Sequence, residues 1–362
     1  MLIKNLRVSH VRVIKQAKLS LSNHLNIITG ANGSGKTSLL ESLYILSSGR
    51  SFRTQQIKNV ISDNQDELMV FAELMNGDKA AIQRSSKGDF QVRINQQSVK
   101  TLSSLSRKLP VTVINPESYA LLTAGPTQRR QYLDFSVFHV EHQYGTIYQN
   151  YQRVLKQRNA SLKLAEDYSS VSTWDKQLVK FGVQITHQRQ REFHSLRSHI
   201  EQIQSTFLPQ YEVQYSLSNG WQGDTEEEFL SSLQAQFSSD KRYGSTQSGP
   251  HRADIILSID GRPASEVLSR GESKMMVIAL LVAQINRITQ DNHQPAMLLL
   301  DDISSELDAN KLSLLLSYLK NIQNLQMLIT AINYDDIGSL IENQLLNEFS
   351  MFHVEHGLVT PA

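Results

Sequence analysis

The chain has 362 residues, which suits one large or two moderate domains, and its 40% hydrophobic content is enough for a sizeable core. It contains no cysteine, which excludes disulfides and thiolate metal sites, and its net charge of +1 means that any nucleic-acid surface must be a local patch. The N-terminus lacks the apolar core of a signal peptide and no apolar run reaches membrane-spanning length, so we expect a cytoplasmic protein without a membrane partner.

The first strong signal is a loop suited to binding phosphates. Residues 25–29, LNIIT, predict a short buried strand, and residues 38–46, SLLESLYIL, have the apolar spacing of a helix. Between them, GANGSGKT fits the pattern GxxxxGK[ST] in the strand-to-helix context that the motif requires. The glycines let backbone amides approach a phosphate, Lys36 supplies a charge and the Thr37 hydroxyl is suited to magnesium. The predicted phosphate-binding residues are Gly30, Ala31, Asn32, Gly33, Ser34, Gly35, Lys36 and Thr37.

The middle of the chain changes from strand-like to helical patterning. Residues 66–100 alternate as antiparallel strands do, in ELMVFAELM, KAAIQR and FQVRIN. Three later stretches have the apolar spacing of helices: 144–155, 174–207 and 226–237. Thr225 and Glu228 form a capping-box pattern before the last of them. Because no heptad repeat persists, we predict a compact helical lobe over about 119–244.

The stretch LSRGESK at 268–274 predicts a helix start. Ser269 and Glu272 have the spacing of a capping box, and a long apolar run follows them. The simple interpretation is an ordinary helix cap. The alternative is that this positive end of a helix is presented to a phosphate bound by another copy of the chain.

A buried strand at 297–300 ends in two adjacent acids, Asp301 and Asp302. Beside a phosphate loop, Asp301 is suited to hold magnesium and Asp302 to orient or deprotonate an attacking water. The alternative for Asp302 is a turn residue that ends the strand. Asp308 then resembles the N-cap of a leucine-rich helix, and QMLITAI at 326–332 predicts another buried strand.

Together, the phosphate loop, the capped LSxGE helix and the DD strand followed by ELD resemble ATP-binding-cassette ATPases. The resemblance implies an α/β fold in which a P-loop ATPase lobe, 1–118 with 245–362, carries a mixed sheet flanked by helices plus antiparallel strands, with the helical lobe inserted. It implies ATP and Mg²⁺ as ligands, with ATP bridging two chains. The signature residues acting in trans would be Ser269, Arg270, Gly271 and Glu272, and Asp308 would belong to the D-loop.

Further stretches narrow the resemblance. PESYALLTAGPTQRRQYLD at 116–134 is similar to the RecF pattern PE…LL…GPxxRRxFLD, and GPHRADI at 249–255 is similar to GPHRDD, with Ala253 as a departure. The chain is thus identified as a member of the RecF family of recombination mediators. The family implies ATP-dependent homodimerisation and binding to double-stranded DNA and ss/dsDNA junctions. It also implies action with RecO and RecR to load RecA, in DNA repair, recombination and the SOS response.

Two positions depart from related ATPases. Transporter-type cassettes have a histidine in the switch position after the last core strand, where this chain has Asn333. An amide cannot carry a proton as an imidazolium does, so we predict a weak ATPase that hydrolyses slowly. The resemblance to RecF implies that DNA stimulates this activity. Arg12 falls where related ATPases place an arginine near nucleotide phosphate, although HVRV replaces the usual FRN. Arg50 and Arg53 are weaker candidates for nucleotide or interface contacts.

The candidate DNA-facing residues are Arg129, Arg130, Arg153, Lys156 and Arg158. Contacts to phosphates predict sequence-tolerant, salt-sensitive binding. The alternative for each residue is a solvated helix face or a structural salt bridge. Arg129 and Arg130 have a lobe interface as a further alternative.

Two other classes of protein are alternatives to this function: an ATPase subunit of a membrane transporter and a nearly inactive nucleotide-binding scaffold. A regulatory GTPase is disfavoured because no NKxD motif follows the phosphate loop. The pentapeptide FHVEH occurs at 138–142 and again at 352–356, but the flanking residues differ and the ligand spacing is not that of a zinc motif. We predict that the first copy begins a helix and that the second lies in a terminal strand.

Overall fold

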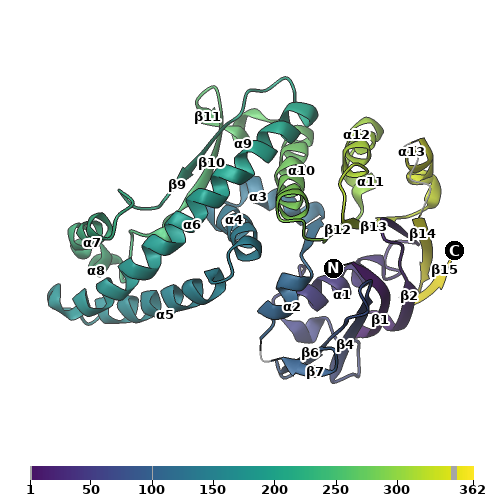
Figure 1. Ribbon diagram of the computed structural model, residues 1–362, viewed down its shortest axis with the longest axis horizontal. Coiled ribbons are helices and arrows are strands. Elements are labelled where there is room, and N and C mark those ends of the chain that lie inside the picture. The colour runs from purple at the N-terminus through teal and green to yellow at the C-terminus, as the bar shows by residue number, and fades with distance from the viewer. Residues whose placement is uncertain (1, 100, 344–348) are drawn as a thin grey trace. The chain divides into compact units, whose positions relative to one another are not determined.

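The computed structural model describes residues 2–99, 101–343 and 349–362 (Figure 1). The chain divides into two compact units. Unit 1 comprises Met1–Ser118 and Ile285–Ala362, and unit 2 comprises Tyr119–Gln284. Unit 2 therefore continues past the predicted lobe boundary at 244, because the strand Asp254–Ile259 pairs with the strand Gln214–Ser218.

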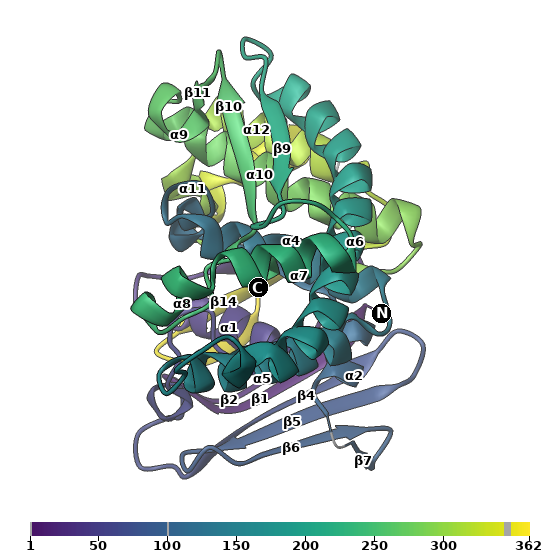
Figure 2. The same ribbon diagram turned by 90° about the vertical axis from the view of Figure 1, so that its left-hand side faces the viewer.

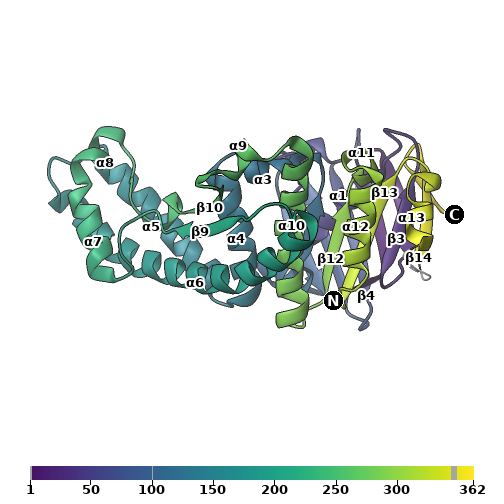
Figure 3. The same ribbon diagram turned by 90° about the horizontal axis from the view of Figure 1, so that it is seen from above.

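Unit 1 contains a six-stranded mixed sheet in the order β15-β14-β3-β13-β12-β8, in which only β15 is antiparallel to its neighbour (Figure 3). Its strands are β3 (Leu25–Thr29), β8 (Val111–Ile114), β12 (Ala296–Leu300), β13 (Leu325–Ala331), β14 (Phe349–Glu355) and β15 (Leu358–Pro361). Every residue of β3, β12 and β13 is buried, since central parallel strands are covered on both faces. The predicted buried strands are therefore confirmed.

A second six-stranded sheet of unit 1 is antiparallel, in the order β2-β1-β4-β5-β6-β7 (Figure 2). Its strands are β1 (Ile3–Val11), β2 (Ile14–Ser20), β4 (Glu67–Leu74), β5 (Lys79–Ser85), β6 (Phe90–Ile94) and β7 (Gln97–Val99). The strands predicted within 66–100 are confirmed as far as residue 99, and residue 100 lies outside the described residues. Alternate side chains of β4 are buried, as expected of a sheet with one face on the core.

Helix α1 (Lys36–Ser48) joins the two sheets of unit 1 into one core. This apolar core contains residues of α1, of the antiparallel sheet and of the mixed sheet, among them Leu39, Leu40, Leu43, Leu6, Val70, Ile28 and Leu328. The other helices of the unit are α2 (Ser103–Lys108), α11 (Ile303–Glu306), α12 (Ala309–Leu319) and α13 (Gly338–Asn343). Short 3-10 turns lie at Ile57–Asn59, Pro116–Tyr119 and Tyr334–Asp336, and a π-helical segment lies at Arg287–Asp291. The helix that carries the phosphate loop is thus anchored by a large buried surface.

Unit 2 is mainly helical and also contains a small sheet. Its helices are α3 (Ala120–Thr123), α4 (Pro126–Val140), α5 (Tyr144–Leu162), α6 (Ser169–Phe207), α7 (Glu226–Ala235), α8 (Phe237–Tyr243), α9 (Ala264–Val267) and α10 (Arg270–Asn286), which ends in unit 1, and a short turn lies at Pro250–Arg252. The strands β9 (Gln214–Ser218), β10 (Asp254–Ile259) and β11 (Arg262–Pro263) form a sheet in the order β11-β10-β9. In the described part of the chain, none of the helices has both the length and the apolar character of a membrane span.

Of three local sequence signals, two agree with the structure and one does not. Thr225 caps α7 in a complete capping box with Glu228, as predicted. The first FHVEH copy ends α4, so the prediction that it begins a helix is wrong. The preceding segment is already helical from Pro126, because proline is favoured in the first turn of a helix. The second copy lies in and just after β14, in agreement with the predicted strand.

Candidate nucleotide-binding site

The phosphate loop runs from the end of β3 to the start of α1. One side of it packs closely against the end of β14 and the turn that follows. Gly30, Gly33 and Gly35 have backbone φ values of 148°, 79° and 122°, which residues other than glycine rarely adopt. A Cβ at Gly30 would lie 2.2 Å from the carbonyl oxygen of Val354. The Gly357 amide donates to the Ser34 carbonyl at 2.8 Å. The turn between β14 and β15 thus supports the loop.

Polar groups of the loop fit a phosphate ligand. Gly35 caps α1 without a side-chain hydrogen bond, so the helix start offers amides to an anion. The Ser34 hydroxyl is buried and has no hydrogen-bond partner in the described part of the chain, which a phosphate oxygen would provide. The Lys36 ammonium donates to the carbonyl oxygens of Gly30 and Ala31 at 2.6 and 3.1 Å. Burial lowers the pKa of Lys36, and the charges of Asp302 and Asp301 oppose that effect.

Two hydroxyl groups converge on Asp301. Thr37 from α1 and Thr330 from β13 each donate to Asp301 Oδ1 at 3.0 Å. They meet there because β3, β13 and β12 are parallel neighbours whose carboxyl ends share one edge of the sheet. Burial raises the pKa of Asp301, and the bonds from Thr37 and Thr330 oppose the rise.

The oxygen atoms of Thr37 and Asp301 fit a magnesium ion. Magnesium prefers hard oxygen ligands and is commonly held by one or two carboxylates together with phosphates of the substrate. The described residues contain no cluster of three or more histidine or acidic side chains that could bind a metal without such a ligand. Thr37 and Asp301 would therefore hold magnesium jointly with a nucleotide.

Asp302 follows at the same sheet edge in a left-handed backbone conformation, with φ 53° and ψ 37°. Its amide donates to Thr330 Oγ1 at 2.8 Å, and its Oδ1 accepts a bond from the Ser305 hydroxyl at 2.8 Å. Its side chain is half-buried, and its negative charge acts on the Lys36 ammonium. Asp302 therefore both turns the chain out of β12 and places a carboxylate beside the phosphate loop.

Asn333 lies just beyond β13, at the exposed N-cap of the turn Tyr334–Asp336. Its backbone N–H donates to Asp336 Oδ2 at 2.9 Å, and its side chain accepts from the backbone N–H of Asp336. Asp308 caps α12 by accepting from the Lys311 amide at 3.0 Å, as the sequence predicts. Both candidate residues therefore have a local structural role as caps, and Asn333 also follows closely after β13.

Arg12 is held by a residue that the sequence reasoning missed. Its Nε and Nη2 atoms donate to the two carboxylate oxygens of Glu41, both at 2.9 Å, and its Nη1 donates to the Asn59 carbonyl at 2.8 Å. Glu41 is fully buried in α1, and its hydrogen bond raises the pKa of Arg12. A single acid within the apolar pattern of SLLESLYIL was the available signal for this pair.

The weaker candidates near the loop differ in their surroundings. Arg53 is exposed, and its charge partly offsets the raised pKa of Asp301, which places it in electrostatic reach of the site. The charge of Arg50 acts instead on Tyr44, whose pKa is raised by burial. Arg53 is therefore the better candidate of the two for a nucleotide contact.

The signature segment in unit 2 has the predicted cap. The backbone amide and the hydroxyl of Ser269 donate to Glu272 Oε2 at 2.9 and 2.6 Å, and the Glu272 amide donates back to Ser269 Oγ at 3.4 Å. Ser269 and Arg270 are exposed, and Gly271 is half-buried at the start of α10. The start of this helix is therefore accessible and ordered by a side-chain pair.

The structure separates the candidate DNA-facing residues into two groups. Arg158 is fully buried between Asp175 and Asp240, at 2.6 Å from each, so the prediction that it faces DNA is wrong. Because the side chain is fully buried, a DNA phosphate cannot reach its guanidinium. Arg153 and Lys156, on the other side of α5, are exposed.

Arg129 and Arg130 are also engaged within unit 2. Arg129 pairs with both oxygens of Asp254 at 2.7 and 2.8 Å, which is the structural salt bridge named as the alternative. Arg130 donates to the Ala253 carbonyl at 2.8 Å and is half-buried. Both arginines therefore tie α4 to the start of β10, and the exposed candidates reduce to Arg153 and Lys156.

Comparisons with known proteins agree with this arrangement. Residues 2–344 match the family described as RecF/RecN/SMC N terminal domain. The DNA replication and repair protein RecF of Shewanella loihica is 39% identical over 363 residues, covering 99% of both chains. The protein of the same name from Shewanella oneidensis is 40% identical over 358 residues, covering 98% of both chains.

Solved structures support the fold. The recombination mediator protein RecF-ATP in the RecFOR pathway has a TM-score of 0.88 at 23% identity, covering 100% of this chain and 97% of that chain. An Smc head bound to the C-winged helix domain of ScpA has a TM-score of 0.59 at 14% identity, covering 100% and 97%. The predicted α/β fold of the ATP-binding-cassette type is confirmed. The chain belongs to the RecF family of DNA replication and repair proteins.

Proposed function

We propose that this chain is an ATP-dependent DNA-binding switch. Two copies would sandwich ATP between the phosphate loop of one and the signature helix of the other. The observation that carries the proposal is that one chain holds both halves of such a site: a loop with a buried, unpartnered Ser34 hydroxyl, and an exposed, capped helix start at Ser269. Each half supplies donors for phosphate oxygens.

Hydrolysis to ADP and phosphate would then release the dimer. Asp302 would orient or deprotonate the attacking water, while Lys36 and the loop amides hold the terminal phosphates. Magnesium, held by Thr37 and Asp301, would neutralise phosphate charge. Asn333 lacks the proton-carrying capacity of a histidine, so turnover would be weak and slow. As a separate part of the proposal, DNA would stimulate this turnover.

The DNA ligand would be a duplex or an ss/dsDNA junction, contacted through phosphates by exposed cations such as Arg153 and Lys156. We further propose that the chain works with RecO and RecR to load RecA at gaps and stalled forks, in the cytoplasm. Support comes from relatives described as DNA replication and repair proteins. The same relatives make a transporter subunit an unfavoured alternative.

The decisive experiment is sedimentation velocity with ADP, ATP and a non-hydrolysable ATP analogue, with and without duplex DNA. We expect dimers with ATP and the analogue but not with ADP, and stronger DNA binding by the dimer. Lys36→Ala and Ser269→Ala should each abolish or strongly weaken the dimer, whereas Ser265→Ala, at an exposed serine of α9, should not. If Lys36→Ala and Ser269→Ala assembled on DNA as the parent does, ATP bridging would be wrong.

A further inference from the structure

The segment between α6 and β9 contacts the signature motif within unit 2. Tyr211 Oη donates to Glu272 Oε1 at 3.0 Å, and Gln210 Nε2 donates to the same oxygen at 3.2 Å. Glu272 Oε2 is occupied by the amide and the hydroxyl of Ser269. The carboxylate therefore has one oxygen on the signature serine and the other on Tyr211 and Gln210.

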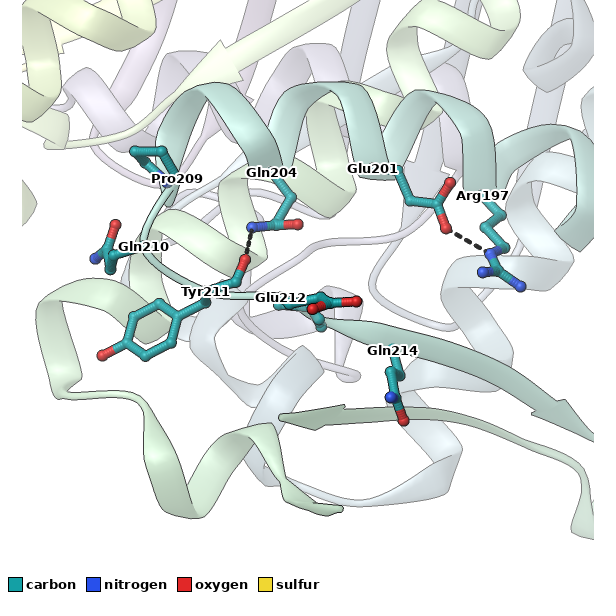
Figure 4. Close-up of a pocket in the computed structure, with 9 residues that line it drawn as sticks. Arg197, Glu201, Gln204, Pro209, Gln210, Tyr211, Glu212 and Gln214 are labelled. Atoms are coloured by element: carbon teal, nitrogen blue, oxygen red, sulfur yellow. Dashed lines mark hydrogen bonds and ion pairs between the residues drawn. The ribbon is translucent and has the colours of Figure 1, made fainter. Parts of the chain in front are cut away.

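The position of Tyr211 is itself fixed by the end of α6. Figure 4 shows Gln204 reaching from α6 to the backbone oxygen of Tyr211. Gln204 is buried, and its Nε2 donates to the carbonyls of Leu208 and Tyr211 at 2.8 and 2.9 Å. The backbone carbonyl of Tyr211 is therefore fixed by the buried side-chain amide of Gln204.

The orientation of Glu272 decides what the signature can offer to a phosphate. A serine hydroxyl has a single hydrogen, and in this structure the Ser269 hydrogen is directed at Glu272 Oε2. If the carboxylate rotated away, the cap would open and the first turn of α10 would lose its order. The donors on Oε1 hold the carboxylate against that rotation. The bonds from Ser269 lower the pKa of Glu272, and those from Tyr211 and Gln210 add to the effect.

We infer that Tyr211 is a positioning residue for ATP-driven dimerisation: by holding Glu272, it keeps the Ser269 cap closed and the first-turn backbone amides of α10 arranged for the terminal phosphate of a nucleotide bound by a second copy. The inference rests on the proposed function. Tyr211 does not touch the nucleotide in this scheme. It acts through Glu272, and Gln210 assists.

Tyr211→Phe tests the inference, because it removes only the hydroxyl. The dimerisation constant with the non-hydrolysable analogue should weaken about 10-fold, the effect of one hydrogen bond to a charged group at the lower end of its range. ATP affinity of the protomer, measured below the dimerisation range, should not change. Gln210→Ala should weaken the dimer less. Tyr243→Phe, at an exposed tyrosine of the same unit, is the matched control and should match the parent.

A double-mutant cycle separates positioning from a general structural effect. Tyr211→Phe should weaken the dimer much less in a Ser269→Ala background, because both residues act through the same cap. Equal losses in both backgrounds, or a Tyr211→Phe dimer as strong as the parent while Ser269→Ala is weakened, would overturn the positioning role and leave ATP bridging intact. If Ser269→Ala itself has no effect, the proposed function fails instead.

Discussion

The two acids that follow β12 share one hydroxyl group. Thr330 Oγ1 donates to Asp301 Oδ1 and accepts the amide of Asp302, so the same side chain aims the proposed magnesium ligand and fixes the turn after it. The left-handed conformation of Asp302 is uncommon for residues other than glycine and asparagine. This geometry turns the Asp302 carboxylate out of the strand, toward the face where Lys36 lies.

Asp302→Asn therefore separates charge from shape. Asparagine tolerates the left-handed backbone and can still accept from Ser305, but it cannot take a proton from water. We expect ATP binding and dimer formation to persist, with turnover reduced on the order of 100-fold or more and a longer-lived dimer. Single-turnover ATP hydrolysis and dimer lifetime measure both effects. Asp335→Asn, at an exposed acid, is the control, and unchanged turnover in Asp302→Asn would exclude the catalytic role.

His251, in the GPHRADI stretch, is a structural residue with a pH signature. Its Nε2 lies 2.9 Å from the Thr246 carbonyl, which can only accept, so Nε2 carries the hydrogen and Nδ1 accepts from the Tyr151 hydroxyl at 2.7 Å. Burial lowers the pKa of His251 from 6.5 to about 4. The neutral ring is therefore the form that the fold contains.

The sign of the pH dependence follows from these values. Between pH 6.5 and about 4 the unfolded chain binds a proton that folded His251 does not, so the free energy of unfolding falls as the pH falls. We expect a contribution of about 2 kcal/mol between pH 7.5 and pH 5. His251→Gln keeps a donor and an acceptor and should reduce the decrease in the free energy of unfolding between these pH values, as measured by urea unfolding at both. His187→Gln, at an exposed histidine, should leave that decrease unchanged.

Helix α5 carries both exposed and buried cationic side chains. Arg153 and Lys156 point to solvent, whereas Arg158 is buried with Asp175 and Asp240. Burial raises the pKa of Asp240, and the Arg158 guanidinium opposes the rise. The folded state of unit 2 therefore depends on the Arg158 charge.

Arg158→Ala should destabilise unit 2 by about 3–5 kcal/mol, because it leaves two buried carboxylates without a partner. Arg153→Ala, on the same helix, should change stability by no more than about 0.5 kcal/mol. Both tryptophans of the chain, Trp174 and Trp221, lie in unit 2, so their fluorescence during urea unfolding reports this unit specifically. Equal stability of the two variants would show that the buried network contributes nothing.

The elements that could be predicted are those whose signals lie close together in the sequence. Thr225 with Glu228, Asp308 with Lys311, and Ser269 with Glu272 each cap a helix through residues three positions apart. The long apolar pattern of α6 was equally readable. Capping and periodicity are local properties, so these predictions needed no knowledge of the tertiary fold.

What the sequence could not reveal depends on distant partners. Arg158 lies on the apolar face of α5, four positions after Val154, whereas Arg153 does not, but its acidic partners Asp175 and Asp240 are 17 and 82 positions away. The pairing of β9 with β10 and the grip of Tyr211 on Glu272 are likewise long-range. Of the candidate site, the loop and the two acids were readable, whereas Glu41, which holds Arg12, was not singled out.

Considered as a whole molecule, the chain is nearly neutral, with a net charge of +1. The proposed DNA binding would therefore depend on particular cations and not on the overall field. Replacing Arg153 and Lys156 by glutamate should weaken duplex binding and lower the salt slope of the affinity by roughly 2, since each lost phosphate contact removes about one released counterion.

The matched control carries the same change in net charge elsewhere. Lys87→Glu with Arg93→Glu alters two exposed cations of unit 1 and should leave the salt slope close to that of the parent. Titrations at several salt concentrations, with the non-hydrolysable ATP analogue present, measure both slopes. An unchanged slope for the Arg153 and Lys156 variant would remove α5 from the DNA surface.

The placement of β3 has a consequence for biosynthesis. Leu25 pairs with Met327 of β13 on one side and Phe349 of β14 on the other. The strand before the phosphate loop therefore gains both neighbours only after β13 and β14 have been translated, long after β3 itself. A nascent chain on the ribosome would expose this apolar strand and carry the whole GANGSGKT motif with no functioning site. Products that end before β13 would lack the completed sheet and so could not hold nucleotide at their own phosphate loop.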